Sequence, residues 1–124
     1  DRKQIVKGLI GMAGAYNIYP IAVEEVKPVF NHPNYPSRSQ PIDYTAGKKL
    51  PTLLLVPETD TLVSIEKNTT QFHNALVKDG SPAQVVTVKG TDHITLVATL
   101  SPLLFFKGSS TEPIQKFISS LTKK

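Results

Sequence analysis

The sequence predicts an α/β protein with a parallel sheet flanked by helices. Two short runs, 5–13 and 50–56, are almost wholly apolar, and a third run, 83–88, is rich in β-branched residues. Such runs are typical of strands buried on both faces. Segments with helical spacing of apolar residues, 64–79 and 111–121, follow the second and third runs. Strands that alternate with helices favour parallel pairing, because parallel neighbours need a crossover connection.

The first run is closed by Gly14 and predicts a strand buried on both faces. Residues 19–49 then contain five prolines, which interrupt any regular period and allow only a short helix around Ala22 to Val26. A loop of this length inside a compact unit is usually functional. We therefore expect a cap-like insertion at about residues 19–49, which we call the cap segment.

The second half of the chain predicts the remaining elements in order. Residues 50–56 form the central strand, Ser64 offers an N-cap oxygen to the next helix, and Gly80 ends it. Residues 83–88 form the third strand. The last helix is capped by Thr111 and carries a single apolar stripe of Ile114, Phe117, Ile118 and Leu121.

Composition excludes several classes of protein. The net charge of +4 comes from 14 basic against 10 acidic residues that are scattered, so we expect no nucleic-acid partner. No run approaches the ~18 to 20 apolar residues that span a bilayer, so we expect no membrane partner. The absence of cysteine excludes disulfides and a thiol nucleophile, and we expect no cofactor and no metal. The sequence is compatible with a secreted or a cytoplasmic protein. The N-glycosylation pattern Asn68-Thr69-Thr70 favours secretion, although such triplets also occur by chance.

Two side chains with complementary chemistry follow neighbouring strands. Asp60 comes after the central strand and His93 after the third strand. The carboxyl ends of parallel strands meet at one edge of a sheet, so we expect these side chains to lie together. An aspartate beside a histidine orients the imidazole and stabilises its protonated form, as in a catalytic triad. Asp92 is a weaker candidate for the acid, because adjacent residues rarely orient each other's side chains.

Residues 50–93 resemble the α/β-hydrolases, specifically the esterase and lipase branch that includes kynurenine formamidase-like enzymes. That family typically carries His-Gly-x-x-Asp-x-x-Val-Pro after a strand and Gly-x-x-His after the next. This chain has Val56-Pro57-Glu58-Thr59-Asp60-Thr61-Leu62-Val63-Ser64 and Gly90-Thr91-Asp92-His93, so the Asp, Val and His align while Val56-Pro57 and Ser64 depart from the pattern. The resemblance implies that Asp60 is the triad acid and His93 the general base of a serine hydrolase.

The nucleophile of that family is missing from the sequence. Its Gly-x-Ser-x-Gly turn has no counterpart, and Gly108-Ser109-Ser110 lacks the second glycine and follows the histidine. The family order of Ser, Asp and His implies a serine before residue 1. Residues 1–124 would then be the C-terminal part of one α/β-hydrolase domain, inactive alone and partnered by an N-terminal fragment or chain that carries the nucleophile.

The expected function is hydrolysis of carboxylic esters or small amides. Tyr16 is a candidate for contact with substrate or for the core, and Ile94, directly after His93, is a second candidate substrate contact. The alternative is a non-catalytic protein that binds a small ligand on the same scaffold.

Overall fold

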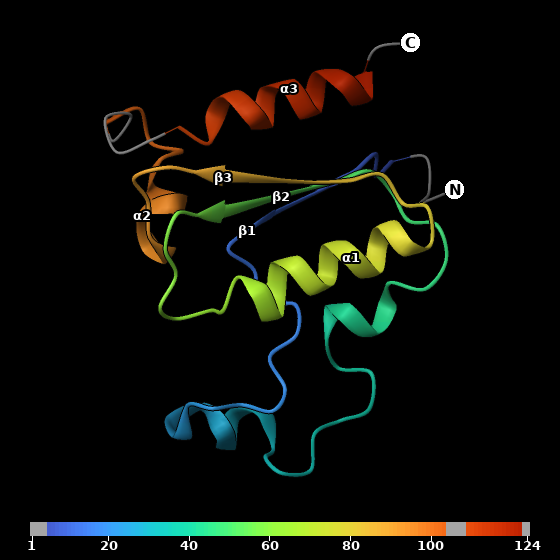
Figure 1. The fold of residues 1–124 in the computed structure, drawn as a ribbon, viewed down its shortest axis with the longest axis vertical. Coiled ribbons are helices and arrows are strands. Elements are labelled where there is room, and N and C mark those ends of the chain that lie inside the picture. The colour runs from blue at the N-terminus through green and yellow to red at the C-terminus, as the bar shows by residue number, and fades with distance from the viewer. Residues whose placement is uncertain (1–4, 104–108, 123–124) are drawn as a thin grey trace.

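The computed structural model describes residues 5–103 and 109–122. It confirms the α/β class: three parallel strands form one sheet in the order β1-β2-β3. Helix α3 covers one face of the sheet and α1 the other, while α2 lies at the C-terminal ends of the strands (Figure 1). The bounds are Leu9–Met12 for β1, Thr52–Pro57 for β2, Ala83–Val88 for β3, Gln71–Lys78 for α1, His93–Ala98 for α2 and Thr111–Thr122 for α3.

The central strand β2 carries the core of the molecule. Leu53 and Leu55 pack with Phe117 of α3 on one face, whereas Leu54 packs with Phe72 of α1 on the other. Side chains alternate across a strand, so a strand covered on both faces must be apolar throughout. This is why the run around residues 53–55 has no polar alternation.

Strand β1 differs from its prediction. We expected a strand over residues 5–13 that is buried on both faces, but β1 comprises only Leu9–Met12 and Leu9 is 46% exposed. The physical reason is its place in the sheet, because β1 pairs with β2 on one side only. Ile5 and Val6, which precede it, are also exposed. In the described part of the chain, no strand pairs with the outer edge of β1.

The cap segment contains two short 3-10 helices and no strand. The first, η2 (Glu24–Phe30), begins two residues after the predicted helix and contains Pro28, and the second is η3 (Pro41–Tyr44). Neither helix has a buried residue. Elsewhere in the cap segment Ile21 is buried, and Ile42 of η3 packs against the cluster around Leu54, so the apolar contacts of the segment are few.

Polar contacts and stacked rings hold the cap segment instead. The side-chain oxygen of Gln40 accepts hydrogen bonds from the backbone N–H groups of Ile18 and Tyr19. The Tyr19 ring stacks on Tyr35 with ring centroids 3.8 Å apart. These contacts join the start of the segment to Tyr35 and Gln40 in its middle.

The two long helices, α1 and α3, lie where the sequence predicts them, with differences in their first turns and in the apolar stripe of α3. Ser64 Oγ accepts from the Lys67 N–H at 3.2 Å, a π-helical turn η4 (Glu66–Thr70) leads into α1, and Gly80 after α1 has the positive φ of a left-handed stop. Thr111 is the first residue of α3 rather than its cap, and Ile118 lies at the exposed side of the predicted apolar stripe. Among the described helices, none combines the length and the apolar character needed to span a membrane.

Candidate active site

The loops after β2 and β3 are joined at the C-terminal edge of the sheet. The carbonyl of Thr91 accepts hydrogen bonds from the backbone N–H groups of Glu58 and Thr59, at 3.1 and 3.3 Å. The Glu58 carboxylate in turn accepts from the Gly90 N–H at 2.9 Å. These three hydrogen bonds fix the loop after β2 against the loop after β3. The side chains that follow in the two loops are thereby brought close together.

Asp60 and His93 are the residues that meet there. Asp60 Oδ2 lies 2.7 Å from His93 Nδ1, across a separation of 33 residues in the chain. The side chain of Asp60 is 1% exposed and that of His93 is 30% exposed. The structure thus has the juxtaposition that the sequence predicts, with the carboxylate enclosed and the imidazole open to solvent on one side.

The surroundings of Asp60 keep its carboxyl group ionised. Burial by itself raises the pKa of Asp60, but hydrogen bonds from the N–H of Val63, from His93 and from the N–H of Leu62 outweigh it and hold the pKa below its usual value. Oδ1 accepts the two backbone bonds, at 2.8 and 2.9 Å, which leaves Oδ2 for the imidazole.

The ionised carboxylate determines the tautomer of His93. A carboxylate can only accept a hydrogen bond, so His93 Nδ1 must carry the proton, and in the neutral ring Nε2 then has the free electron pair. No residue that the structure describes forms a hydrogen bond with Nε2. The ring can therefore take a proton at Nε2 from a hydroxyl group that lies within hydrogen-bond distance of that atom.

Asp92 has a structural role. Its Oδ1 accepts from the N–H groups of Ile94 and Thr95 at 3.1 and 2.8 Å, which makes it the N-cap of α2. Hydrogen bonds from Thr95, and more weakly from Ile94, lower the pKa of Asp92. Asp60 rather than Asp92 pairs with His93, while Asp92 determines where α2 begins.

The two candidate substrate contacts lie in different environments. Tyr16 is 8% exposed and its ring stacks on Phe72, with centroids 4.5 Å apart, on the α1 side of the sheet. A Cβ atom on Gly11 would lie 1.9 Å from the Tyr16 hydroxyl, so any larger residue at this position would collide with the Tyr16 side chain. These contacts favour the core interpretation of Tyr16. Ile94 is 72% exposed in the first turn of α2, beside His93.

The serines near the C-terminus do not supply a nucleophile to this site. Ser110 is fully buried, and its hydroxyl lies 2.6 Å from that of Thr99. This contact joins the end of α2 to the start of α3. Ser109 lies in the wall of a separate hollow, and Gly108 lies outside the described residues.

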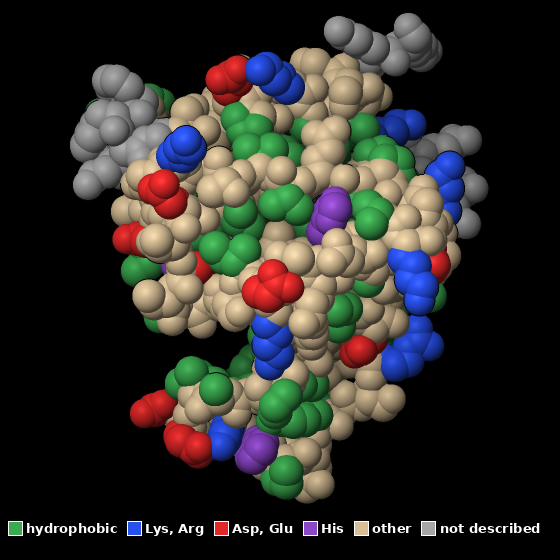
Figure 2. Space-filling view, in the orientation of Figure 1, with side chains coloured by type: hydrophobic (Ala, Val, Ile, Leu, Met, Phe, Trp, Pro, Cys, Tyr) green, Lys and Arg blue, Asp and Glu red, His purple; other side chains and the backbone are tan. Residues whose placement is uncertain are grey.

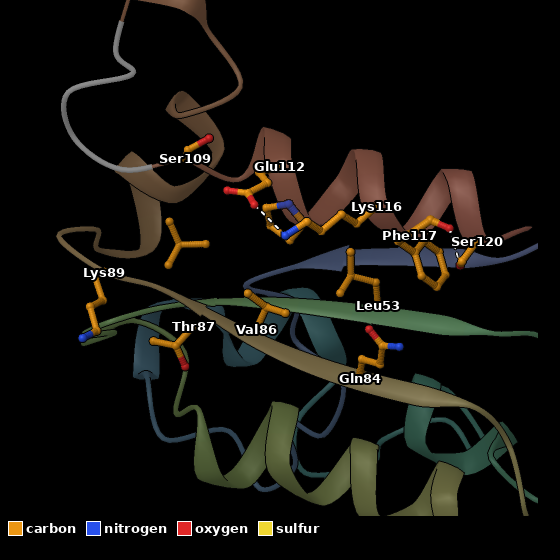
Figure 3. Close-up of a pocket in the computed structure, with 12 residues that line it drawn as sticks. Leu53, Gln84, Val86, Thr87, Lys89, Ser109, Glu112, Lys116, Phe117 and Ser120 are labelled. Atoms are coloured by element: carbon orange, nitrogen blue, oxygen red, sulfur yellow. Dashed lines mark hydrogen bonds and ion pairs between the residues drawn. The ribbon is translucent and has the colours of Figure 1, made fainter.

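That hollow, of about 630 Å³, lies between α3 and β3 (Figure 3). Leu53, Val86 and Phe117 form its apolar part, and an ion pair of 2.6 Å between Lys116 and Glu112 lies in its wall. Neither Asp60 nor His93 lines it. We therefore do not assign the hollow to the same chemistry.

Asn68 illustrates what the sequence pattern could not show. It is buried, its side-chain oxygen accepts from the Asn17 N–H at 2.8 Å, and its amide donates to Ser64 O at 3.1 Å. An amide used in this way is not available for glycosylation in the folded chain, so the pattern at Asn68 has a structural explanation.

The sequence analysis did not predict that the carbonyl of Thr91 joins the two loops. A backbone acceptor leaves no signal in the sequence.

No metal centre is assembled within residues 5–103 and 109–122, where no group of three or more His, Asp or Glu side chains could hold an ion. Comparisons of the chain with protein-family models, with curated proteins and with solved structures gave no significant match. The Asp60–His93 pair is therefore the main indication of function.

Proposed function

We propose that the protein is a serine hydrolase of carboxylic esters or small amides, in which this chain supplies the acid and the base of a Ser-His-Asp triad. The supporting observation is the 2.7 Å contact between Asp60 Oδ2 and His93 Nδ1 at the C-terminal edge of a parallel sheet. An α/β sheet alone is shared by many functions, so the pair of side chains rather than the fold carries the proposal. The resemblance of residues 50–93 to the esterase and lipase branch of the α/β-hydrolases points the same way.

Each group has a defined task in this reaction. His93 Nε2 takes the proton of a serine hydroxyl as the serine oxygen attacks the substrate carbonyl, and the protonated ring then gives that proton to the departing alcohol or amine. Asp60 holds the ring in the Nδ1–H tautomer and offsets its positive charge. A water molecule, activated in the same way by His93, releases the acyl group from the serine.

The proposal includes a second polypeptide segment or chain that carries the serine, so that this chain alone is inactive. Two exposed apolar surfaces support it. One is the edge strand β1 with its preceding residues, where Ile5, Val6 and Leu9 are exposed. The other lies on α2 and the turn after it, at Ile94, Val97, Leu100 and Leu103. An open apolar strand edge is a site for pairing with another strand.

Replacement of His93 by Ala tests the proposal. In the native protein, with its partner, hydrolysis of p-nitrophenyl acetate should fall by about a thousandfold or more, because the general base is lost. His73→Ala on α1 is the matched control and should keep normal turnover, since His73 contacts Asn74 and Ala83 rather than Asp60. Near-normal turnover by His93→Ala would contradict the assignment.

A fluorophosphonate that captures activated serines tests the division of the triad. The adduct should appear on a polypeptide segment other than residues 1–124, and its formation should be lost in His93→Ala. Labelling of a serine within these residues would contradict the proposed partner. Ligand binding without any adduct or turnover would favour a non-catalytic small-ligand-binding protein.

A further inference from the structure

A groove of about 320 Å³ separates the first part of the cap segment from the loop after β2. We call it the cap groove; residues from 15–30 form one wall and residues from 62–68 the other. The space-filling view shows an open notch between the sheet-bearing part of the molecule and the region of η2 (Figure 2). The C-terminal ends of β2 and β3, where α2 begins, face the same side of the molecule as this notch (Figure 1).

The cap groove adjoins the Asp60–His93 pair through its second wall. Leu62 and Val63 line the groove, and their backbone N–H groups donate to Asp60 Oδ1. The other oxygen of Asp60 binds His93. Neither Asp60 nor His93 lines the groove itself, but Asp60 binds both the groove wall and His93, so we expect a substrate whose carbonyl lies at His93 to extend a substituent past Leu62 into the groove.

The lining of the cap groove selects for apolar groups. Apart from three polar residues, every residue that lines it is apolar, including Ile18, Ile21, Val26 and Phe30 from the cap side. Ligand pockets of this kind are mostly apolar and measure ~300–1,000 Å³, so the cap groove is at the small end of the range. At roughly 30 Å³ for each water-sized group, the cap groove has room for about ten non-hydrogen atoms of a ligand.

The three polar residues of the lining are already engaged with the protein. Lys67 Nζ donates to the carbonyls of Ile18 and Pro20, both at 3.1 Å, so its ammonium group is directed at the cap backbone. Ser64 accepts from the Lys67 N–H, and Asn68 bonds to Asn17 and Ser64. These contacts determine the width of the groove by joining its walls, and they leave little to recognise a charged ligand.

From this arrangement we infer that the cap groove binds an uncharged acyl chain of about four to eight carbons, which forms the acyl side of the ester or amide cleaved at His93. This inference rests on the proposed function for its link to catalysis. The binding of the chain does not depend on the nucleophile. Lys67 is a positioning residue, because it acts by holding Ile18 and Pro20 in the opposite wall.

Titration of the chain with 1-octanol tests the groove without any turnover. The amide signals of Leu62 and Val63 should shift in a ¹H–¹⁵N correlation spectrum. Val26→Trp, which places a large side chain in the groove, should weaken the affinity about tenfold or more. Val29→Trp is the matched control, because Val29 lies on the same 3-10 helix, is exposed and does not line the groove. Ala22→Leu fills the groove from a second exposed position and should act like Val26→Trp.

Three outcomes of the titration would overturn the inference. These are the absence of shifts at Leu62 and Val63, equal weakening by Val26→Trp and Val29→Trp, and tighter binding of octanoate than of 1-octanol. The last result would assign Lys67 to an anionic ligand instead.

Chain-length dependence tests the link to catalysis. In the native protein with its partner, Val26→Trp should lower kcat/KM for p-nitrophenyl octanoate about tenfold more than for p-nitrophenyl acetate, whereas Val29→Trp should change neither value. An equal loss for both esters would contradict the acyl assignment. Octanol binding with no hydrolysis of either ester would overturn the proposed function and the acyl link, and would show that the groove binds apolar chains.

Discussion

The sheet with its helices and the cap segment are stabilised in different ways. Leu53, Leu54 and Leu55 of β2 lie in two apolar clusters, one beneath α3 and the other beneath α1. The 3-10 helices of residues 19–49 bury no residue and are held by side-chain to backbone hydrogen bonds and stacked rings. Extensive hydrophobic burial therefore stabilises the part that positions Asp60 and His93, whereas polar contacts, stacked rings and a few apolar side chains such as Ile21 and Ile42 hold the cap segment. Substitutions in the two regions should therefore differ in how much they lower the free energy of unfolding and in the contacts through which they do so.

The largest effect is expected for Leu54→Ala. Its side chain is fully buried against Phe72 and Leu76, so its removal should lower the free energy of unfolding by about 2–5 kcal/mol. Urea denaturation followed by circular dichroism measures the change. Leu103→Ala, the same substitution at an exposed position, is the control. An equal loss in the two variants would remove the contrast between buried and exposed leucines.

Asn68→Ala should have the next largest effect. It leaves the Asn17 N–H and the Ser64 carbonyl without their side-chain partner, which costs about 1–3 kcal/mol when such groups are buried. The Asn17 amide should also exchange its hydrogen faster, as the cap segment loosens where it leaves the sheet. Asn74→Ala on the exposed side of α1 should change neither quantity. Unaltered exchange at Asn17 would contradict the tethering role.

The carboxyl group of Asp60 makes the free energy of unfolding depend on pH. Its pKa is lowered in the folded chain from an unfolded value of about 3.8, so its stabilising contribution is complete above that pH and is lost as the pH falls through the folded pKa. Urea denaturation at pH 5.5 and at pH 2.5 should show a smaller loss in Asp60→Asn than in the native chain, because the variant has no carboxyl group there to protonate. If the free energy of unfolding falls equally in the native chain and in Asp60→Asn between pH 5.5 and pH 2.5, the ionised, hydrogen-bonded state of Asp60 is contradicted.

The smallest effect is expected for Val29→Ala in the cap segment. The side chain is exposed on a helix that buries nothing, so the free energy of unfolding should change by no more than about 0.5 kcal/mol. Thermal denaturation measures this directly. A loss near that of Leu54→Ala would show that the cap segment has an apolar core of its own.

Much of the sheet and the Asp60–His93 pair could be predicted because the relevant signals are local or follow from strand direction. The β3 strand has its predicted bounds, and the predicted helix after Ser64 is present as the π-helical turn η4 followed by α1, which ends before Gly80. The parallel strands β2 and β3 end at the same edge of the sheet, so the residues that follow them lie close together. The cap segment could not be predicted in the same way, since its prolines exclude regular structure without specifying what replaces it. The carbonyl of Thr91, which joins the loops after β2 and β3, belongs to the backbone and has no residue signature.

By itself the sequence located the strands β2 and β3 and the helices α1 and α3, and it predicted that an aspartate and a histidine share one edge of the sheet, because apolar period and strand direction are properties of short stretches of chain. The helix α2 was not predicted. Only the tertiary structure decided that β1 is a partly exposed edge, that Tyr16 belongs to the core and that residues 15–30 form a groove beside Asp60. Burial and distance between remote residues arise when the elements pack together, and no local pattern records that packing.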